Sequence, residues 1–140
     1  MGGLWSPFFI MTDTTNTPRP KRPKLDDRPA INAEWLERMR TTKPEFLLRL
    51  FEVFMAEEPK RLAALVGAVT QADLEQVRYL AHSLKGAAAS LGMERLRDAC
   101  RELEFAAKDA DTSALAKELV PVAEEMERIF KEIRRVMSPV

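Results

Sequence analysis

The spacing of apolar residues after Ile31 constrains the fold more than any other feature, because it is helical throughout. In the last part of the chain, apolar residues recur at alternating intervals of four and three, which aligns them along one seam of a helix. These residues are Leu115, Leu119, Val122, Met126, Ile129, Ile133 and Val136. Glycine is scarce in this region and strand-like alternation is missing. The pattern therefore predicts an all-α domain.

The first two helices start at recognisable signals. Asn32 is a suitable N-cap for a short helix that runs to about Arg40. Pro44 suits the first turn of a second helix, and its apolar pattern continues beyond Pro59. We expect one long helix with a kink at Pro59, although two separate helices are also possible. The residues expected to face the core from these helices are Trp35, Leu36, Met39, Phe46, Leu47, Leu50, Phe51, Phe54, Leu62, Leu65, Val66 and Val69.

Three more helices follow with short connections. The third is predicted to start at Asp73, its N-cap, and to end at Gly92. The fourth is predicted over 93–108, with Cys100 as core filler. The DADT sequence ends it, and Asp111 or Thr112 is expected to cap the fifth. Four amphipathic helices joined in this way predict an antiparallel four-helix bundle, and the short additional N-terminal helix is expected to cover one end.

The segment before Ile31 has a different composition. Residues 12–30 are rich in threonine and proline and predict an extended linker. We therefore divide the chain into a disordered tail over 1–30 and a helical bundle over 31–140. The RPKRPK cluster in the linker is interpreted as part of a solvated tail rather than as a nucleic-acid patch.

The apolar start, MGGLWSPFFIM, is too short to cross a bilayer. It also lacks the basic region and the cleavage site of a signal peptide. Two interpretations stay open: Met11 is the natural start, or the segment anchors the protein to a membrane surface or a partner.

Charge balance and the scarcity of cysteine and histidine exclude several functional classes. The chain has 22 basic and 22 acidic residues, so no overall field attracts it to nucleic acid. One cysteine and one histidine allow neither a disulfide framework nor an ordinary zinc site. No glycine-rich phosphate-binding loop is present. We expect a cytoplasmic protein that has no membrane span, binds no metal or cofactor, and does not phosphorylate itself from ATP.

The stretch AHSLKGAAASLG, residues 81–92, contains the single histidine, His82. On a helical wheel, His82 lies roughly 130° from the centre of the apolar stripe, so it is predicted to face solvent. Its neighbours three and four residues away include the cations Arg78 and Lys85 and the aromatic Tyr79. The stripe expected to face the core is formed by Leu74, Val77, Ala81, Leu84, Ala88 and Leu91.

Gly86 and Ala89 leave the surface beside His82 almost free of side chains. Glycine inside a helix costs about 1 kcal/mol relative to alanine, and close approach of another macromolecule would explain it. A neutral imidazole near cations suits acceptance and donation of a phosphoryl group. The alternative from the wheel alone is that His82 is an ordinary surface residue.

AHSLKGAAASLG resembles the signature of histidine phosphotransfer domains, in which a histidine is followed by an apolar residue, Lys-Gly, small residues and a glycine. The resemblance covers about 31–136 and includes FLLRLFEVFMAEEPKRLAAL before the motif and RLRDACRELEFAAK after it. It implies that His82 carries the phosphoryl group on Nε2, that Lys85 stabilises its charge, and that Gly86 lets a partner dock. Some members place a glutamine on the neighbouring helix near the imidazole, and 93–108 contains none, so that role is either vacant or filled by another polar group.

The resemblance also implies the partners. They are response-regulator receiver domains, whose aspartate exchanges phosphate with the histidine, and a hybrid sensor kinase. The docking residues are then expected to be Arg78, Tyr79, Gly86 and Ala89, on a monomeric protein. The alternative function is a non-catalytic interaction module that sequesters a response regulator. A metal or haem carrier would need more ligands than the chain offers.

Overall fold

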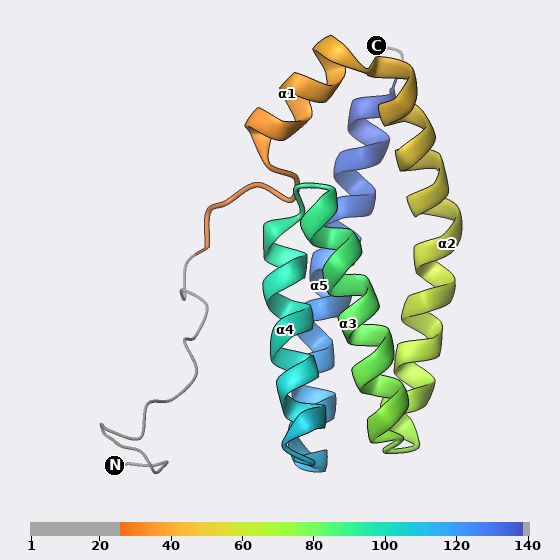
Figure 1. Ribbon diagram of the computed structural model, residues 1–140, viewed down its shortest axis with the longest axis vertical. Helices are drawn as coiled ribbons and strands as arrows, with labels where there is room; N and C mark the ends of the chain where they lie inside the picture. Colours follow the sequence, from red (N-terminus) through yellow and green to blue (C-terminus); the bar gives the residue numbers. More distant parts are fainter. Residues whose placement is uncertain (1–25, 139–140) are drawn as a thin grey trace.

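The structure is a computed structural model that describes residues 26–138 (Figure 1). This part of the chain forms five helices and contains no strand: α1 (Ala33–Thr42), α2 (Pro44–Thr70), α3 (Leu74–Ser90), α4 (Glu94–Lys108) and α5 (Thr112–Met137). Helices α2 to α5 form a ring in which each helix contacts its two neighbours and not the helix diagonally opposite. The predicted all-α four-helix bundle is confirmed. The predictions for the apolar start and for RPKRPK lie outside the described residues.

Two of the predicted N-caps, Asn32 and Asp73, form side-chain hydrogen bonds, while Asp111 occupies the N-cap position of α5 without one. The Asn32 side chain accepts a hydrogen bond from the Trp35 amide at 2.8 Å, and Asp73 accepts one from the Gln76 amide at 3.2 Å. Each satisfies a backbone donor that the first turn of a helix leaves unpaired. Pro59 lies inside a continuous α2, so the prediction of one long helix is confirmed.

Three helix ends share one geometry. α2, α3 and α4 are each followed by a residue in the left-handed region: Ala72 with φ 54°, Gly92 with φ 70° and Ala110 with φ 54°. The amide of the next residue then donates to the carbonyl five residues back, at 2.9, 2.9 and 3.0 Å respectively. This is the Schellman motif, in which glycine is the usual left-handed residue. The sequence predicted this ending at Gly92 only.

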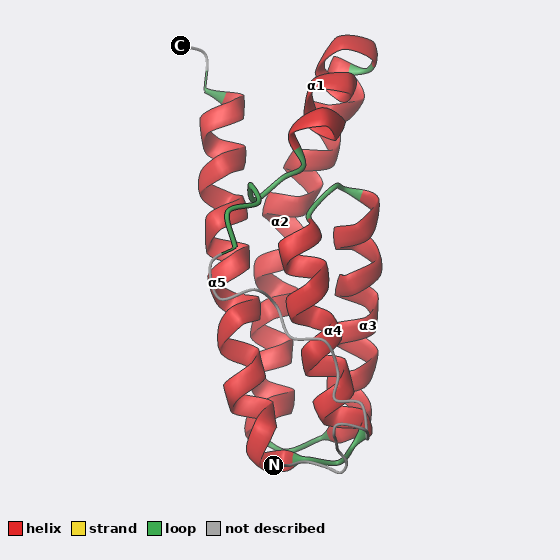
Figure 2. Ribbon diagram, turned by 90° about the vertical axis from the view of Figure 1, so that its left-hand side faces the viewer, coloured by secondary structure: helices red, strands yellow, loops and turns green. Residues whose placement is uncertain are grey.

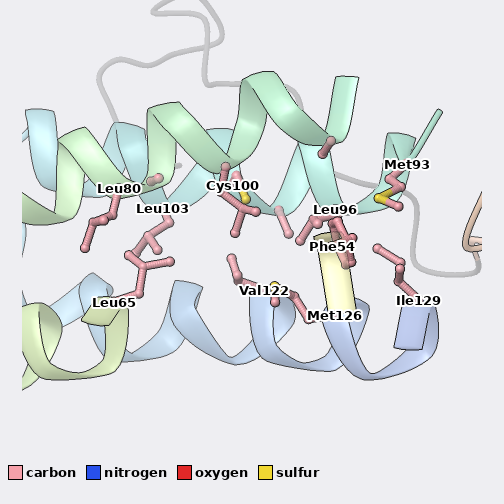
Figure 3. Close-up of a cluster of buried hydrophobic side chains, with 14 of the residues drawn as sticks. Phe54, Leu65, Leu80, Met93, Leu96, Cys100, Leu103, Val122, Met126 and Ile129 are labelled. Atoms are coloured by element: carbon pink, nitrogen blue, oxygen red, sulfur yellow. The ribbon is translucent and has the colours of Figure 1, made fainter. Parts of the chain in front are cut away.

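The core lies between the four bundle helices (Figure 3). Phe54 of α2 meets Phe130 of α5 edge to face, with ring centroids 5.9 Å apart, and Cys100 is buried as predicted. The seam predicted for the last helix also faces inward. Large side chains that are fully buried are Phe51, Leu65, Leu84, Leu96, Leu103, Leu115, Met126, Ile129 and Ile133.

The prediction that Phe46 and Val66 face the core was wrong. Their side chains are 50% and 44% exposed, respectively. Each directly adjoins a buried leucine, Leu47 or Leu65, and adjacent residues in a helix point about 100° apart. Consecutive apolar residues therefore cannot all lie on one face of a helix. The residue farther from the centre of the buried face is exposed to solvent.

α1 and the segment before it close one end of the bundle, beside the α3–α4 turn (Figures 1 and 2). The Asn32 amide donates to the Gly92 carbonyl at 2.7 Å. Ala30 and Ile31 are buried, and Arg28 pairs with Asp98 of α4 at 2.9 Å. Within the described chain, the residues just before Ile31 therefore also pack against the bundle. Among the described helices, none is long and apolar enough to cross a membrane.

Candidate functional site around His82

His82 lies on the outer face of α3, as the helical wheel predicted. Its side chain is 69% exposed. The opposite stripe of α3 is buried, with Val77, Ala81, Leu84 and Ala88 fully inaccessible. The helix thus has a core face and a solvent face, and the imidazole belongs to the solvent face.

Glu104 of α4 links His82 to Lys85. One carboxylate oxygen, Oε2, lies 3.0 Å from His82 Nδ1, and the other, Oε1, lies 2.7 Å from Lys85 Nζ. A carboxylate can only accept hydrogen bonds, so the contact requires that Nδ1 carries the proton. In the neutral imidazole, Nε2 then keeps its lone pair. The contact therefore favours the tautomer in which Nε2 is the nucleophilic nitrogen.

The charge of Glu104 is stabilised where it lies. Burial acts to raise the pKa of this carboxyl, but the hydrogen bonds from Lys85 and His82 outweigh burial and hold its pKa below the ordinary value. Glu104 is consequently ionised at neutral pH. A fixed negative charge at Nδ1 can stabilise the positive charge that the ring acquires when Nε2 forms a bond.

The other predicted site residues share this face. Arg78, Gly86 and Ala89 are exposed, and Tyr79 is 67% exposed. A Cβ atom added to Gly86 would meet nothing within 4 Å. Packing inside the chain therefore does not require glycine at this position, which leaves the approach of a partner as a reason for it.

Glu104 is the site residue that the sequence interpretation missed. Some members of the resembling family have a glutamine on the fourth helix, and here that helix supplies a carboxylate instead. One signal could have found it. A short turn centred on Gly92 places residues at similar distances from the turn side by side, and His82 and Glu104 lie ten and twelve residues from it.

The thiol of Cys100 does not contribute to the site. Burial raises the pKa of the Cys100 thiol to about 12, so this side chain remains protonated and inert. Within residues 26–138, no three His, Cys, Asp or Glu side chains are grouped so that they could hold a metal ion. The chemistry available at the site is that of the imidazole, the carboxylate and the lysine.

Comparison with known proteins identifies the family and the fold of the chain. The family model of the Hpt domain matches residues 49–136, and the chain belongs to this family. This membership assigns the chain to phosphotransfer in two-component signalling. A solved structure with the same fold is histidine-containing phosphotransfer protein B (HptB) from Pseudomonas aeruginosa PAO1. The TM-score is 0.71 at 21% identity, over 76% of this chain and 93% of that chain. No curated protein matches the sequence.

Proposed function

We propose that the chain is a phosphorelay intermediate, in which His82 accepts a phosphoryl group from the aspartate of one receiver domain and passes it to another. The observation that carries the proposal is the 3.0 Å contact between Glu104 and Nδ1, which in the neutral imidazole places the lone pair on Nε2, on a side chain that is 69% exposed. A hybrid sensor kinase would supply the phosphate through its receiver domain.

The transfer step uses the groups already described. The Nε2 lone pair attacks phosphorus, the Nε2–P bond forms, and the bond between phosphorus and the aspartyl oxygen breaks. The aspartate leaves as a carboxylate with the bonding electron pair. The Nδ1 proton stays on the ring and continues to donate to Glu104, whose charge offsets the positive charge of the phosphorylated imidazole. The reverse step returns the phosphoryl group to an aspartate.

Lys85 is placed to stabilise the phosphoryl group. Its ammonium binds the same carboxylate as His82 does, and Lys85 follows His82 by about one turn of α3. The Lys85 side chain is 28% exposed, so it can turn toward incoming phosphoryl oxygens. Arg78, Tyr79, Gly86 and Ala89 would then form the surface on which the receiver domain rests.

The test compares His82→Gln with Gln76→Ala, an exposed change on the same helix. Each protein is incubated with a receiver domain that has been phosphorylated by acetyl phosphate, and label on the chain is measured. We expect His82→Gln to fold normally and to accept no phosphate, and Gln76→Ala to behave as wild type. Equal labelling of wild type and His82→Gln would refute the proposal. A wild type that binds the receiver but takes no label would favour the sequestering module instead.

A further inference from the structure

A groove of about 530 Å³ opens between α2 and α5, close to the C-terminal end of α5. This volume lies within the range of about 300–1,000 Å³ that is usual for ligand pockets. The side chains that line this recess, here called the α2–α5 groove, come from both helices: Glu52, Met55, Ala56, Ile133, Arg134, Met137 and Ser138. Ile133 is fully buried, while Met55 and Met137 are partly buried. A largely apolar recess is therefore open to solvent.

Other apolar side chains are exposed on the same two helices. Leu48 precedes Glu52 by one turn of α2 and is 46% exposed. Val66 of α2 and Val120 of α5 are 44% and 53% exposed. Scattered apolar side chains need no explanation, but an apolar recess with apolar neighbours is typical of a binding surface. Methionine is flexible and adapts to apolar partners of irregular shape, so the occupant that we expect is apolar.

The groove lies across the bundle from the candidate site. In the ring of helix contacts, α2 and α5 adjoin each other on one side, and α3 and α4 adjoin each other on the opposite side. The contact between His82 and Glu104 joins α3 to α4. A group bound in the α2–α5 groove would therefore leave His82 accessible, so binding there is independent of the proposed function.

The chain itself contains a segment of matching composition. Residues 4–11, LWSPFFIM, lie outside the described residues and are here called the apolar segment. No charged side chain occurs among residues 1–12. Burial of apolar side chains is favourable roughly in proportion to the area that they remove from water. The apolar segment supplies six large side chains of this kind: Leu4, Trp5, Phe8, Phe9, Ile10 and Met11.

The apolar segment is tethered close enough to reach the groove. Residues 12–25 join it to Asp26, and these 14 residues span at most about 46 Å, at about 3.3 Å each. Asp26 is held beside α5, because its carboxylate lies 3.7 Å from Arg95, which pairs with Glu125 of α5 at 2.8 Å (Figure 2). Ile133 follows Glu125 by eight residues, which is about 12 Å along the helix. A path across α5 adds its diameter of about 10–12 Å, so the connection is long enough.

We propose that the apolar segment packs into the α2–α5 groove of its own chain. A short tether gives a local concentration on the order of 1 mM, so a contact that is weak between separate molecules is occupied within one. In this arrangement the side chains of Met55, Ile133 and Met137 and the aromatic rings of the segment are shielded from water together. The tether favours this occupant over a second copy or a membrane, each of which has to be recruited from solution.

The experiment uses the full chain with Trp35→Phe, in which Trp5 is the only tryptophan. Exposure of Trp5 is measured from its emission maximum and from quenching by acrylamide, and a peptide of residues 1–25 is the exposed reference. The test variant carries Met55→Glu with Met137→Glu, inside the groove. Met55→Gln with Met137→Gln replaces it if circular dichroism shows that the charged variant folds poorly.

The matched control carries Val66→Glu with Val120→Glu, which changes the net charge equally on the same two helices outside the groove. We expect Trp5 in the parent chain to be quenched several-fold less than in the peptide, with emission at shorter wavelength and no dependence on protein concentration. The test variant should lose this protection, and the control should keep it. As a second measurement, removal of residues 1–10 should lower the Tm of the wild type and leave that of the test substitutions unchanged.

Quenching of Trp5 in the parent chain to the same extent as in the peptide would overturn the inference, and so would equal protection in the test and control variants. Protection that grows with protein concentration, together with dimers in sedimentation, would assign the segment to a second copy. Equally tight binding of the test and control variants to vesicles of phosphatidylcholine and phosphatidylglycerol would assign it to a membrane. Both of these results would also overturn the inference.

Discussion

Replacement of Gly92 by alanine tests how the turn between α3 and α4 is held, and with it the alignment of His82 and Glu104. Gly92 has φ 70°, and a Cβ atom there would lie 3.2 Å from Cβ, Cγ and Cδ2 of Trp35. Two penalties therefore act on Gly92→Ala. A left-handed conformation costs a residue with a Cβ about 1–2 kcal/mol. The crowding against Trp35 adds about 1 kcal/mol, at the low end of overpacking effects.

One effect acts in the other direction. Alanine restricts the conformations of the unfolded chain more than glycine does, which raises the free energy of unfolding by about 0.4–1 kcal/mol. The net expected loss for Gly92→Ala is about 2 kcal/mol. In a domain of this size, about 1 kcal/mol corresponds to roughly 4 °C in Tm, so Tm should fall by about 8 °C.

Ala110 is the matched counterpart. It has φ 54° in the same helix-ending motif, and its side chain is exposed. Ala110→Gly removes the left-handed penalty and loses only the restriction of the unfolded chain, so it should stabilise by about 0.5–1 kcal/mol. Urea and thermal unfolding followed by circular dichroism measure both variants. If Gly92→Ala is as stable as wild type, or if Ala110→Gly is destabilised to the same extent, the account of these turns is wrong.

Three further predictions concern the site and the core. Glu104→Ala should slow phosphate acceptance more than Glu104→Gln, because the amide oxygen can still accept from Nδ1–H; equal rates in a receiver assay would contradict the positioning role. Gly86→Ala should stabilise α3 by about 1 kcal/mol yet slow transfer. Gly67→Ala is its control, since a Cβ there also meets nothing within 4 Å and transfer should be unchanged. Burial raises the pKa of Glu58. The contribution of Glu58 to the stability of the protein is therefore greatest below the ordinary pKa of glutamate, and it is lost as the pH rises through the raised pKa of the folded state. In urea unfolding, the stability of Glu58→Leu relative to wild type should therefore rise between pH 5 and pH 8.

Local signals explain most of what the sequence predicted correctly. The N-caps at Asn32 and Asp73 and the ending at Gly92 each depend on residues within a few positions of the helix terminus. The sustained interval of four and three in the last helix likewise marks its buried face. Such features are determined by backbone geometry and by the residue itself, and tertiary packing here agrees with them.

The features that the sequence did not predict correctly are those that tertiary packing determines. Phe46 and Val66 are apolar, but each is adjacent to a leucine that is buried in the core. The packing of the helices determines which residue of such a pair is buried. Ala72 and Ala110 adopt a conformation that alanine disfavours, because the next helix must start in a fixed place. The packing of Asp26 and Arg28 depends on Arg95 and Asp98 of α4, which lie far along the chain. None of these outcomes is encoded in a short window.

The contact between Glu104 and both His82 and Lys85 shows how two helices make a site that neither contains alone. Before phosphate arrives, the carboxylate neutralises Lys85 through one oxygen and orients the imidazole through the other. In the proposed transfer, a phosphoryl group would bring about two negative charges to Nε2, and it would then compete with Glu104 for the lysine. The Nδ1–H bond to Glu104 gains strength at the same moment, because the ring becomes positive. One carboxylate can thus release the cation that binds phosphate while it holds the histidine in place, which an amide without charge would do less well.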